Sequence, residues 1–298
     1  MSSANEVPDS VMRGPAVEPS NLARARRRLL GNPAAVIGIV IVVSVIVAAI
    51  LAPYLAPYPQ HAGSFVDFRS RHQPPSLLHL MGTDNVGRDM LSRVLFGYRV
   101  SLLLVVGVLG VAVPLGVLLG LLAGYFGGKV ETAIMWLTNV MLAVPALVMA
   151  LAISAVLTPD LVHSMIAITA LWWTWHCRLV YRVVKSVVAE DFVEAARVAG
   201  ASHLHILFRE ILPNCTAAIS VKTTLDAGFV ILFGASLSFL GLGVQPPTPD
   251  LGTMVSAGAQ FLPEMWWEAV MPGLAVLYAI LGFNLLGDGL RDMLDVEI

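Results

Sequence analysis

Residues that could power chemistry or transport are sparse in this chain. A phosphate-binding loop needs the spacing G-x-x-x-x-G-K-[ST], whose backbone amides and lysine hold the phosphates of ATP. The nearest stretch, GGKV at 127–130, lacks both the first glycine and the hydroxyl residue. The sequence therefore predicts no ATP site of this type in the chain itself, and we expect it to bind no cofactor or metal of its own.

Carboxylates are the next group to consider, because ion-coupled carriers need ionisable side chains inside the membrane. Lys222 and Asp226 stand four residues apart, and we expect them to form a local ion pair at the cytoplasmic end of a span. Glu131, Glu268 and Asp288 are expected near the ends of spans. No carboxylate is predicted at the centre of a span, which argues against a self-powered carrier and against an intramembrane aspartyl protease or metalloprotease.

A polar segment, EDFVEAARVAGASHLHILFREILPN at 190–214, interrupts the apolar runs on either side of it. Asp191 is the expected N-cap of a first helix, with Glu194 completing a capping box. Gly200 is expected to end that helix in the left-handed conformation. The face that this helix presents consists of small residues and one aromatic residue: Phe192, Ala195, Ala196 and Ala199.

The same polar segment predicts a second helix after Gly200. Ser202 is its expected N-cap, and Pro213 is expected to end it, because the residue before a proline disfavours the helical conformation. Its apolar face consists of Leu204, Leu207, Phe208 and Ile211. Two amphipathic helices held outside the bilayer indicate a docking element for another molecule.

The composition assigns the chain to the polytopic helical membrane proteins. Hydrophobic residues make up 57% of it and charged residues only 13%, whereas soluble domains average about 25% charged residues. A net charge of −2 gives no argument for binding nucleic acid. The two cysteines, Cys177 and Cys215, are expected to be ordinary thiols without a disulfide, provided that the polar segment is cytoplasmic.

Six apolar segments are expected to span the membrane in an all-α fold. The third is expected to bend at Pro145, and Trp172, Trp173, Trp175 and His176 of the fourth are expected to serve in packing or as an interfacial anchor rather than as a ligand site. Gly116, Gly120 and Gly124 recur every four residues in the second, which predicts close helix packing. The predicted spans are 34–52, 102–124, 133–157, 163–183, 223–244 and 267–290.

The positive-inside rule orients these spans. Thirteen of the 18 basic residues, among them Lys222, Arg24 and three neighbouring arginines, fall on the side of the termini. The other five lie in one long loop on the opposite side. Both termini and the segment 190–214 are therefore predicted to be cytoplasmic, with the loop facing outward.

Several motifs in order make the chain similar to a known family. EAARVAG at 194–200 followed by Leu212-Pro213 resembles the EAA loop of binding-protein-dependent ABC importer permeases. GTDNVGRDMLSR, FREILPN, SLSFLGLGVQPPTPDLG and NLLGDGLRD narrow the resemblance to the C-type permease of the dipeptide, oligopeptide and nickel importers. The resemblance runs from about residue 31 to the C-terminus. Glu210 departs from the general pattern, which often has isoleucine there.

The resemblance implies a type I importer permease fold in a bacterial inner membrane. Its expected parts are a disordered cytoplasmic tail (1–33), a first helix (34–52), an extracytoplasmic loop (53–97), a five-helix ABC transmembrane domain (98–290) and a cytoplasmic end (291–298). It further implies a companion B-type permease, two ABC ATPases that bind ATP and Mg, and an extracytoplasmic solute-binding protein.

The resemblance also assigns roles to residues. The alanine-rich face of the first helix is expected to dock on the ATPase, and the Leu204, Leu207 and Phe208 face on the protein's own bundle. In the outer loop, Asp84, Arg88 and Asp89 are expected either to position the loop or to contact the binding protein. The expected ATPase-coupling residues are Glu194, Ala195, Ala196, Arg197, Gly200, Leu212 and Pro213.

Import of di- or oligopeptides is the function that the resemblance implies first, with nickel or another small solute as the alternative. A membrane channel or scaffold that is not driven by ATP is a second class. A membrane enzyme is disfavoured, because the sequence offers no nucleophile–base pair and no metal-ligand spacing.

Overall fold

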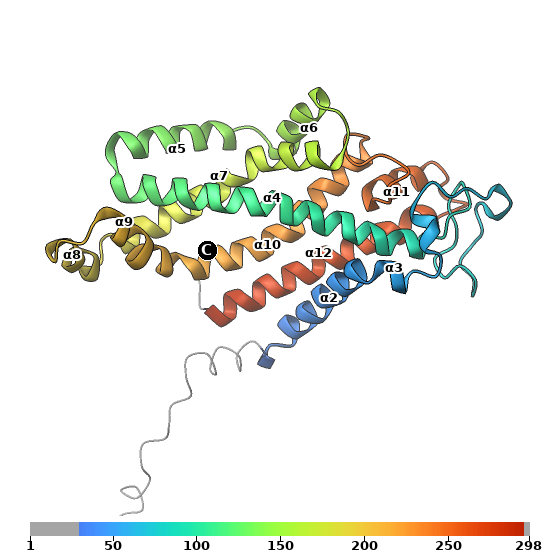
Figure 1. Cartoon of the computed structure of the whole chain (residues 1–298), viewed down its shortest axis with the longest axis horizontal. Coiled ribbons are helices and arrows are strands. Elements are labelled where there is room, and N and C mark those ends of the chain that lie inside the picture. Colours follow the sequence, from blue (N-terminus) through green and yellow to red (C-terminus); the bar gives the residue numbers. More distant parts are fainter. Residues whose placement is uncertain (1–29, 295–298) are drawn as a thin grey trace, which may run out of the picture.

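Helices make up the fold of the part of the chain that this computed structural model describes, residues 30–294, in which no strand forms. Two 3₁₀ turns lie in the outer loop, and a π-helical turn, Ile206–Ile211, precedes α10. The long helices are α2 (Pro33–Ile50), α4 (Met90–Phe126), α7 (Leu161–Val187), α10 (Leu212–Phe239) and α12 (Trp267–Leu294) (Figure 1). The shorter helices are α3 (Ala52–Leu55), α5 (Gly128–Leu142), α6 (Ala146–Val156), α8 (Asp191–Val198), α9 (His203–His205) and α11 (Leu251–Ala259).

The long helices run side by side and place two polar regions at opposite ends of the molecule. The helices α8 and α9 lie at one end, and the loop 56–89 lies at the other (Figure 1). The predicted cytoplasmic tail falls largely on 1–29, outside the described residues, as does the end of the chain at 295–298.

Small residues set the distance between α4 and α7, which pack along one another. A Cβ atom at Gly116 or Gly120 would collide with the α7 backbone, and one at Gly124 would collide with Val184. The glycine stripe predicted in the second span is therefore confirmed as a packing surface.

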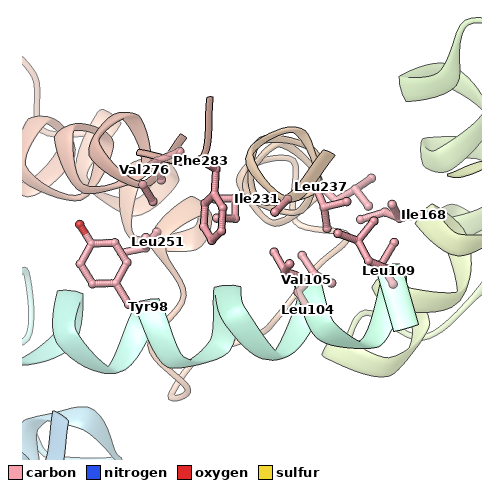
Figure 2. Packing of buried hydrophobic residues seen from close by; sticks show 14 of the residues in the cluster. Tyr98, Leu104, Val105, Leu109, Ile168, Ile231, Leu237, Leu251, Val276 and Phe283 are labelled. Carbon is pink, nitrogen blue, oxygen red and sulfur yellow. The ribbon is translucent and has the colours of Figure 1, made fainter. Parts of the chain in front are cut away.

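An apolar core joins α4, α7, α10 and α12 (Figure 2). Leu104, Val105 and Leu109 of α4 point toward Ile231 and Leu237 of α10 (Figure 2). Tyr98, nearer the start of α4, donates a hydrogen bond from its hydroxyl to the Ala275 carbonyl of α12 at 3.0 Å. The shared core makes these helices one packed body.

Four described helices are long and apolar enough to cross a membrane: Pro33–Ile50, Met90–Phe126, His203–Phe239 and Trp267–Leu294. Together, α5 and α6 make a fifth candidate, bent by 85° where Pro145 precedes α6. The bend predicted at Pro145 is confirmed, while the count of six spans stays a prediction, because α7 with its arginines and histidines is less apolar than these.

The second and fifth spans begin earlier than the sequence predicted. The second is the single 37-residue helix α4, which starts at Met90 with Asp89 as its N-cap. The fifth is continuous from His203 to Phe239, so the prediction that Pro213 ends a helix is wrong. Pro213 lies in the first turn of α10 directly after the π-helical turn, where a missing backbone N–H is tolerated.

Candidate functional site

The first helix of the polar segment is α8, and its start differs from the prediction. Glu190 is the N-cap, with an extended backbone and no side-chain cap bond, so Asp191 is the first helical residue rather than the cap. Asp191 and Glu194 both lie in the first turn, where negative charge favours the helix dipole. The carboxylate of Glu194 is turned toward Arg197, whose Nη1 lies 3.4 Å from Glu194 Oε2, and both side chains are exposed.

The turn between α8 and α9 follows the sequence prediction. Gly200 has φ +79°, a conformation that a residue with a side chain adopts only with strain. The Ala201 amide donates to the Ala196 carbonyl at 3.0 Å, the long-range bond of a Schellman cap. The Ser202 hydroxyl then accepts from the His205 amide at 3.3 Å. Gly200 and Ser202 therefore fix the angle between the two helices.

The inward face of this two-helix element is smaller than predicted. Leu207 is buried, but Leu204 is 67% exposed and Phe208 is 48% exposed, so the assignment of these two residues to the protein's own bundle is wrong. The π-helical turn, with its wider repeat, buries Ile206 beside Leu207 and Ile211 of the predicted face.

A second apolar cluster fastens the two-helix element to the bundle. Val193 of α8 is completely buried and packs with residues of the π-helical turn, of α4 and of α7. Ala196 and Leu212 are half-buried against the same cluster. The outward surface carries Ala195 and the exposed apolar side chains of Phe192 and Val198.

Tyr125, at the end of α4, is a contact of this element that the sequence did not reveal. Its hydroxyl lies 2.8 Å from His203 Nδ1, and the Arg197 guanidinium lies 5.5 Å from the centre of its ring. An aromatic residue at the end of an apolar run carries no signal of such contacts, because the partners lie more than 70 residues away in the sequence.

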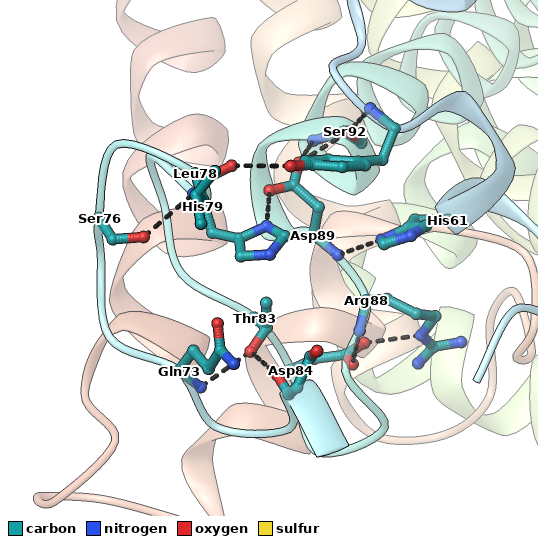
Figure 3. A network of polar contacts seen from close by, with 12 residues as sticks. His61, Gln73, Ser76, Leu78, His79, Thr83, Asp84, Arg88, Asp89 and Ser92 are labelled. Carbon is teal, nitrogen blue, oxygen red and sulfur yellow. Dashed lines mark hydrogen bonds and ion pairs between the residues drawn. The ribbon is translucent and has the colours of Figure 1, made fainter. Parts of the chain in front are cut away.

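At the opposite end, the three outer-loop candidates form a buried polar network (Figure 3). Asp84 accepts from the Arg88 Nε at 2.7 Å and from the Arg88 amide at 2.8 Å. Asp89 caps α4 by accepting from the Ser92 amide at 2.8 Å, and its other oxygen lies 2.9 Å from His79 Nδ1. Asp84, Arg88 and Asp89 are thus hydrogen-bonded within the outer loop and to the start of α4, and the roles predicted for them stay predictions.

This network also ties the loop to distant segments. Arg93 donates from Nη1 to the His61 carbonyl at 3.2 Å, and the Trp267 indole donates to the Thr83 carbonyl at 3.2 Å. His72 Nδ1 lies 2.6 Å from Glu268 Oε1. Burial lowers the pKa of His61, which favours the neutral imidazole that accepts from the Asp89 amide at 2.9 Å.

The ion pair predicted between Lys222 and Asp226 is present. Lys222 Nζ is 2.5 Å from Asp226 Oδ1, so the local pair is confirmed. Because the span begins at His203, Asp226 lies near the middle of α10 and is 1% exposed. His176, near the middle of α7, has Nδ1 3.6 Å from Asp226 Oδ2. Asp226 is therefore a buried carboxylate well inside a helix long enough to cross the membrane, while the placement of Lys222 among the cytoplasmic charges stays a prediction.

The remaining predicted groups serve packing. Trp172 and Trp173 are buried in the middle of α7, with Trp172 against Trp175 and Phe233 at centroid distances of 4.9 and 5.0 Å, so they are not interfacial anchors. Cys177 and Cys215 are free, buried thiols.

Comparison with known proteins agrees with this architecture. Residues 116–298 match the model of the family described as binding-protein-dependent transport system inner membrane component, and residues 20–75 match the N-terminal TM domain of oligopeptide transport permease C. The di/tripeptide transport system permease protein DppC of Pseudomonas aeruginosa is 43% identical over 231 residues, 76% of each chain. The probable D,D-dipeptide transport system permease protein DdpC of Escherichia coli is 39% identical over 267 residues, 90% of this chain and 89% of the relative.

A third relative extends the similarity over nearly the whole chain. The dipeptide transport system permease protein DppC of Escherichia coli is 43% identical over 270 residues, 90% of both chains. The family match at 116–298 includes the two-helix element. The chain therefore belongs to the family of binding-protein-dependent transport system inner membrane components, as a multi-pass protein of a bacterial inner membrane.

Proposed function

We propose that this chain is one of two permease subunits of an ATP-driven importer for short peptides. The relatives are named for dipeptide, di/tripeptide and D,D-dipeptide transport, which supports peptides over nickel as the cargo. The companion permease forms the other wall of the pathway, and a binding protein delivers peptide to the face that carries the outer loop. ATP and Mg are bound by the partner ATPases and not by this chain.

The observation that carries this proposal is the exposed two-helix element of α8 and α9. It lies at the end of the bundle, with Phe192, Ala195 and Val198 on its outer surface. Small and apolar side chains allow a groove on another protein to approach closely. This surface is the ATPase dock, with Glu194 and Arg197 beside it as charged partners.

The inward side of the element explains how force reaches the spans. Val193 is wedged among residues of α4, α7 and the start of α10, and Tyr125 holds α9 to the end of α4. Closure of the ATPase dimer therefore moves these helices together, which suits alternating access by rigid-body motion. Gly200 keeps the angle of the element, and Leu212 and Pro213 continue it into α10.

The test is to purify the importer with its ATPases and companion permease, reconstitute it with binding protein and measure uptake of a labelled dipeptide. Glu194→Lys places a positive charge on the dock, and we expect at least a tenfold loss of uptake while the protein still inserts. Glu264→Lys is the matched control, because Glu264 is exposed and lies in the segment between α11 and α12. Absence of any co-purifying ATPase, or normal uptake by Glu194→Lys, would contradict the proposal.

A further inference from the structure

Three histidines lie in the outer-loop network, and His61 differs from the other two in the direction of its hydrogen bond. His79 Nδ1 lies 2.9 Å from Asp89 Oδ1, and His72 Nδ1 lies 2.6 Å from Glu268 Oε1. A ring nitrogen that donates to a carboxylate keeps that bond whether the imidazole is neutral or protonated. Acid therefore leaves these two contacts in place.

The ring of His61 instead accepts a hydrogen bond from the backbone. The Asp89 amide donates to His61 Nδ1 at 2.9 Å, and both residues are buried (Figure 3). A neutral imidazole has one acceptor nitrogen, whereas a protonated imidazole has none, because both of its nitrogens carry hydrogen. Turning the ring over gives no relief, since either nitrogen would then direct an N–H at the amide. Protonation of His61 therefore breaks this bond and leaves a buried amide without this partner, which costs free energy.

This bond lies where the outer loop is attached to α4. The amide that donates to His61 belongs to the N-cap of α4. Arg93, one turn into the helix, donates from Nη1 to the His61 carbonyl at 3.2 Å. The Tyr58 amide donates to the Ser92 hydroxyl at 3.0 Å. The 3₁₀ turn Pro59–Ala62 is therefore held to the start of α4 by contacts that centre on His61.

Aromatic side chains hold the ring of His61 in this position. Phe65 stacks on it at a centroid distance of 3.9 Å, and Tyr58 stacks at 5.0 Å. These rings exclude water from the imidazole, so a charge on it would lose most of its hydration.

The charged and titratable side chains around His61 oppose one another. They come from the loop and from the start of α4, and they are Asp84, Arg88, Asp89, Arg93 and His79. Burial is the largest influence and lowers the pKa of His61 below its usual value of 6.5. The two carboxylates raise this pKa, whereas His79 and Arg88 lower it further. Neutral His61 therefore stabilises the attached loop above about pH 6.5, and this stabilisation is lost as the pH falls through that value.

We propose that His61 is an acid-sensitive attachment of the outer loop: its neutral ring holds the loop to the start of α4, and protonation releases the turn Pro59–Ala62 from that helix. This inference goes beyond the proposed function and does not depend on the cargo. Because the loop is predicted to face outward, the pH to which it responds is the pH outside the cell.

The experiment measures hydrogen–deuterium exchange of the full-length protein in detergent at about pH 7.5 and about pH 5.5. Protection factors are corrected for the pH dependence of the intrinsic exchange rate. In the wild type, the backbone amides of 60–63 and 89–93 are expected to lose protection at least fivefold at the lower pH. His61→Gln is expected to lose less than twofold, because the glutamine carbonyl can accept from the Asp89 amide and does not titrate.

His163→Gln is the matched control, because His163 lies in the first turn of α7 and contacts Asp160 at 2.8 Å, outside the outer-loop network. It should lose protection in 60–63 and 89–93 as the wild type does. His79→Gln should behave in the same way, since the contact of His79 with Asp89 survives protonation.

The inference is overturned if the wild type loses no protection in these segments, or if His61→Gln loses as much as the wild type. Should His61→Gln not fold, the wild type decides by itself: a loss confined to the outer loop and the first turn of α4 supports the inference, and an equal loss in α10 contradicts it. Peptide uptake has no part in this measurement, so the proposed function stands or fails separately.

Discussion

At the scale of single residues, the backbone conformation of Gly200 determines how α8 and α9 are arranged. Its φ of +79° is strained for any residue with a side chain, although nothing lies within 4 Å of an added Cβ. A substitution there acts on backbone geometry and not through a clash. The angle between α8 and α9 therefore depends on this residue type.

We predict that Gly200→Glu abolishes peptide uptake while the protein still inserts and assembles. The reason is that the strained turn relaxes and turns the ATPase dock away from its partner. The matched control is Gly128→Glu, since Gly128, the first residue of α5, also has positive φ (+53°) and open space around it. The control is expected to keep peptide uptake within twofold of wild type. If both variants lose uptake equally, the effect of Gly200→Glu gives no support to the ATPase dock.

A second prediction at the scale of single residues concerns Asp89. Its carboxylate caps α4, contacts His79 and is 1% exposed. Asp89→Ala should lower the free energy of unfolding by about 2–3 kcal/mol, because a helix cap and buried hydrogen bonds are lost together. Thermal unfolding in detergent measures this effect. Asp67→Ala, which removes the half-buried cap of a short turn, should cost less than half as much, and equal costs would contradict the prediction.

At the scale of elements, α8 has two faces with different tasks. Val193 is buried against the bundle, whereas Phe192 beside it is 41% exposed. Under the proposed function, the inward residue would transmit motion and the outward residue would meet the ATPase. The two faces can therefore be separated by truncating one side chain at a time.

We predict that Val193→Ala keeps the ATPase bound but uncouples it, so that ATP hydrolysis continues while peptide uptake falls at least fivefold. Phe192→Ala should instead weaken retention of the ATPase during purification. The measurements are the ratio of uptake to hydrolysis and the amount of ATPase that co-purifies. If both variants lose the ATPase to the same extent, the assignment of the two faces is wrong.

Sequence patterns predicted the elements of this coupling region better than their boundaries. The residue types alone were sufficient to predict the left-handed conformation of Gly200 and the capping role of Ser202, because local backbone chemistry determines both. The π-helical turn was not predictable, since it arises where Pro213 follows a helix that continues into a span. That single shift left Leu204 and Phe208 exposed, and the continuous helix places the buried Asp226 near the middle of α10. Contacts between distant segments, such as Tyr125 with His203, leave no pattern in one sequence.

At the scale of the whole molecule, the close packing of α4 on α7 holds the bundle together. We predict that Gly120→Leu prevents stable assembly, because an added side chain would meet the Cys177 carbonyl and Val180. Gly110→Leu on the same helix is the control, since nothing lies within 4 Å of its added Cβ. Gel-filtration yield of the assembled importer should fall at least tenfold for the first variant only, and equal yields would show that the helices can separate.

The length of α4 has a mechanical consequence. Its 37 residues extend over about 55 Å, well beyond a hydrocarbon layer of about 30 Å. Asp89 anchors its first turn in the outer-loop network, and Tyr125 joins its last turn to α9. One continuous helix thus connects the end of the molecule that carries the outer loop with the end that carries α8 and α9. Under the proposed function, a shift of α4 along its axis on arrival of a loaded binding protein would reach the ATPase end directly, without a relay of side chains.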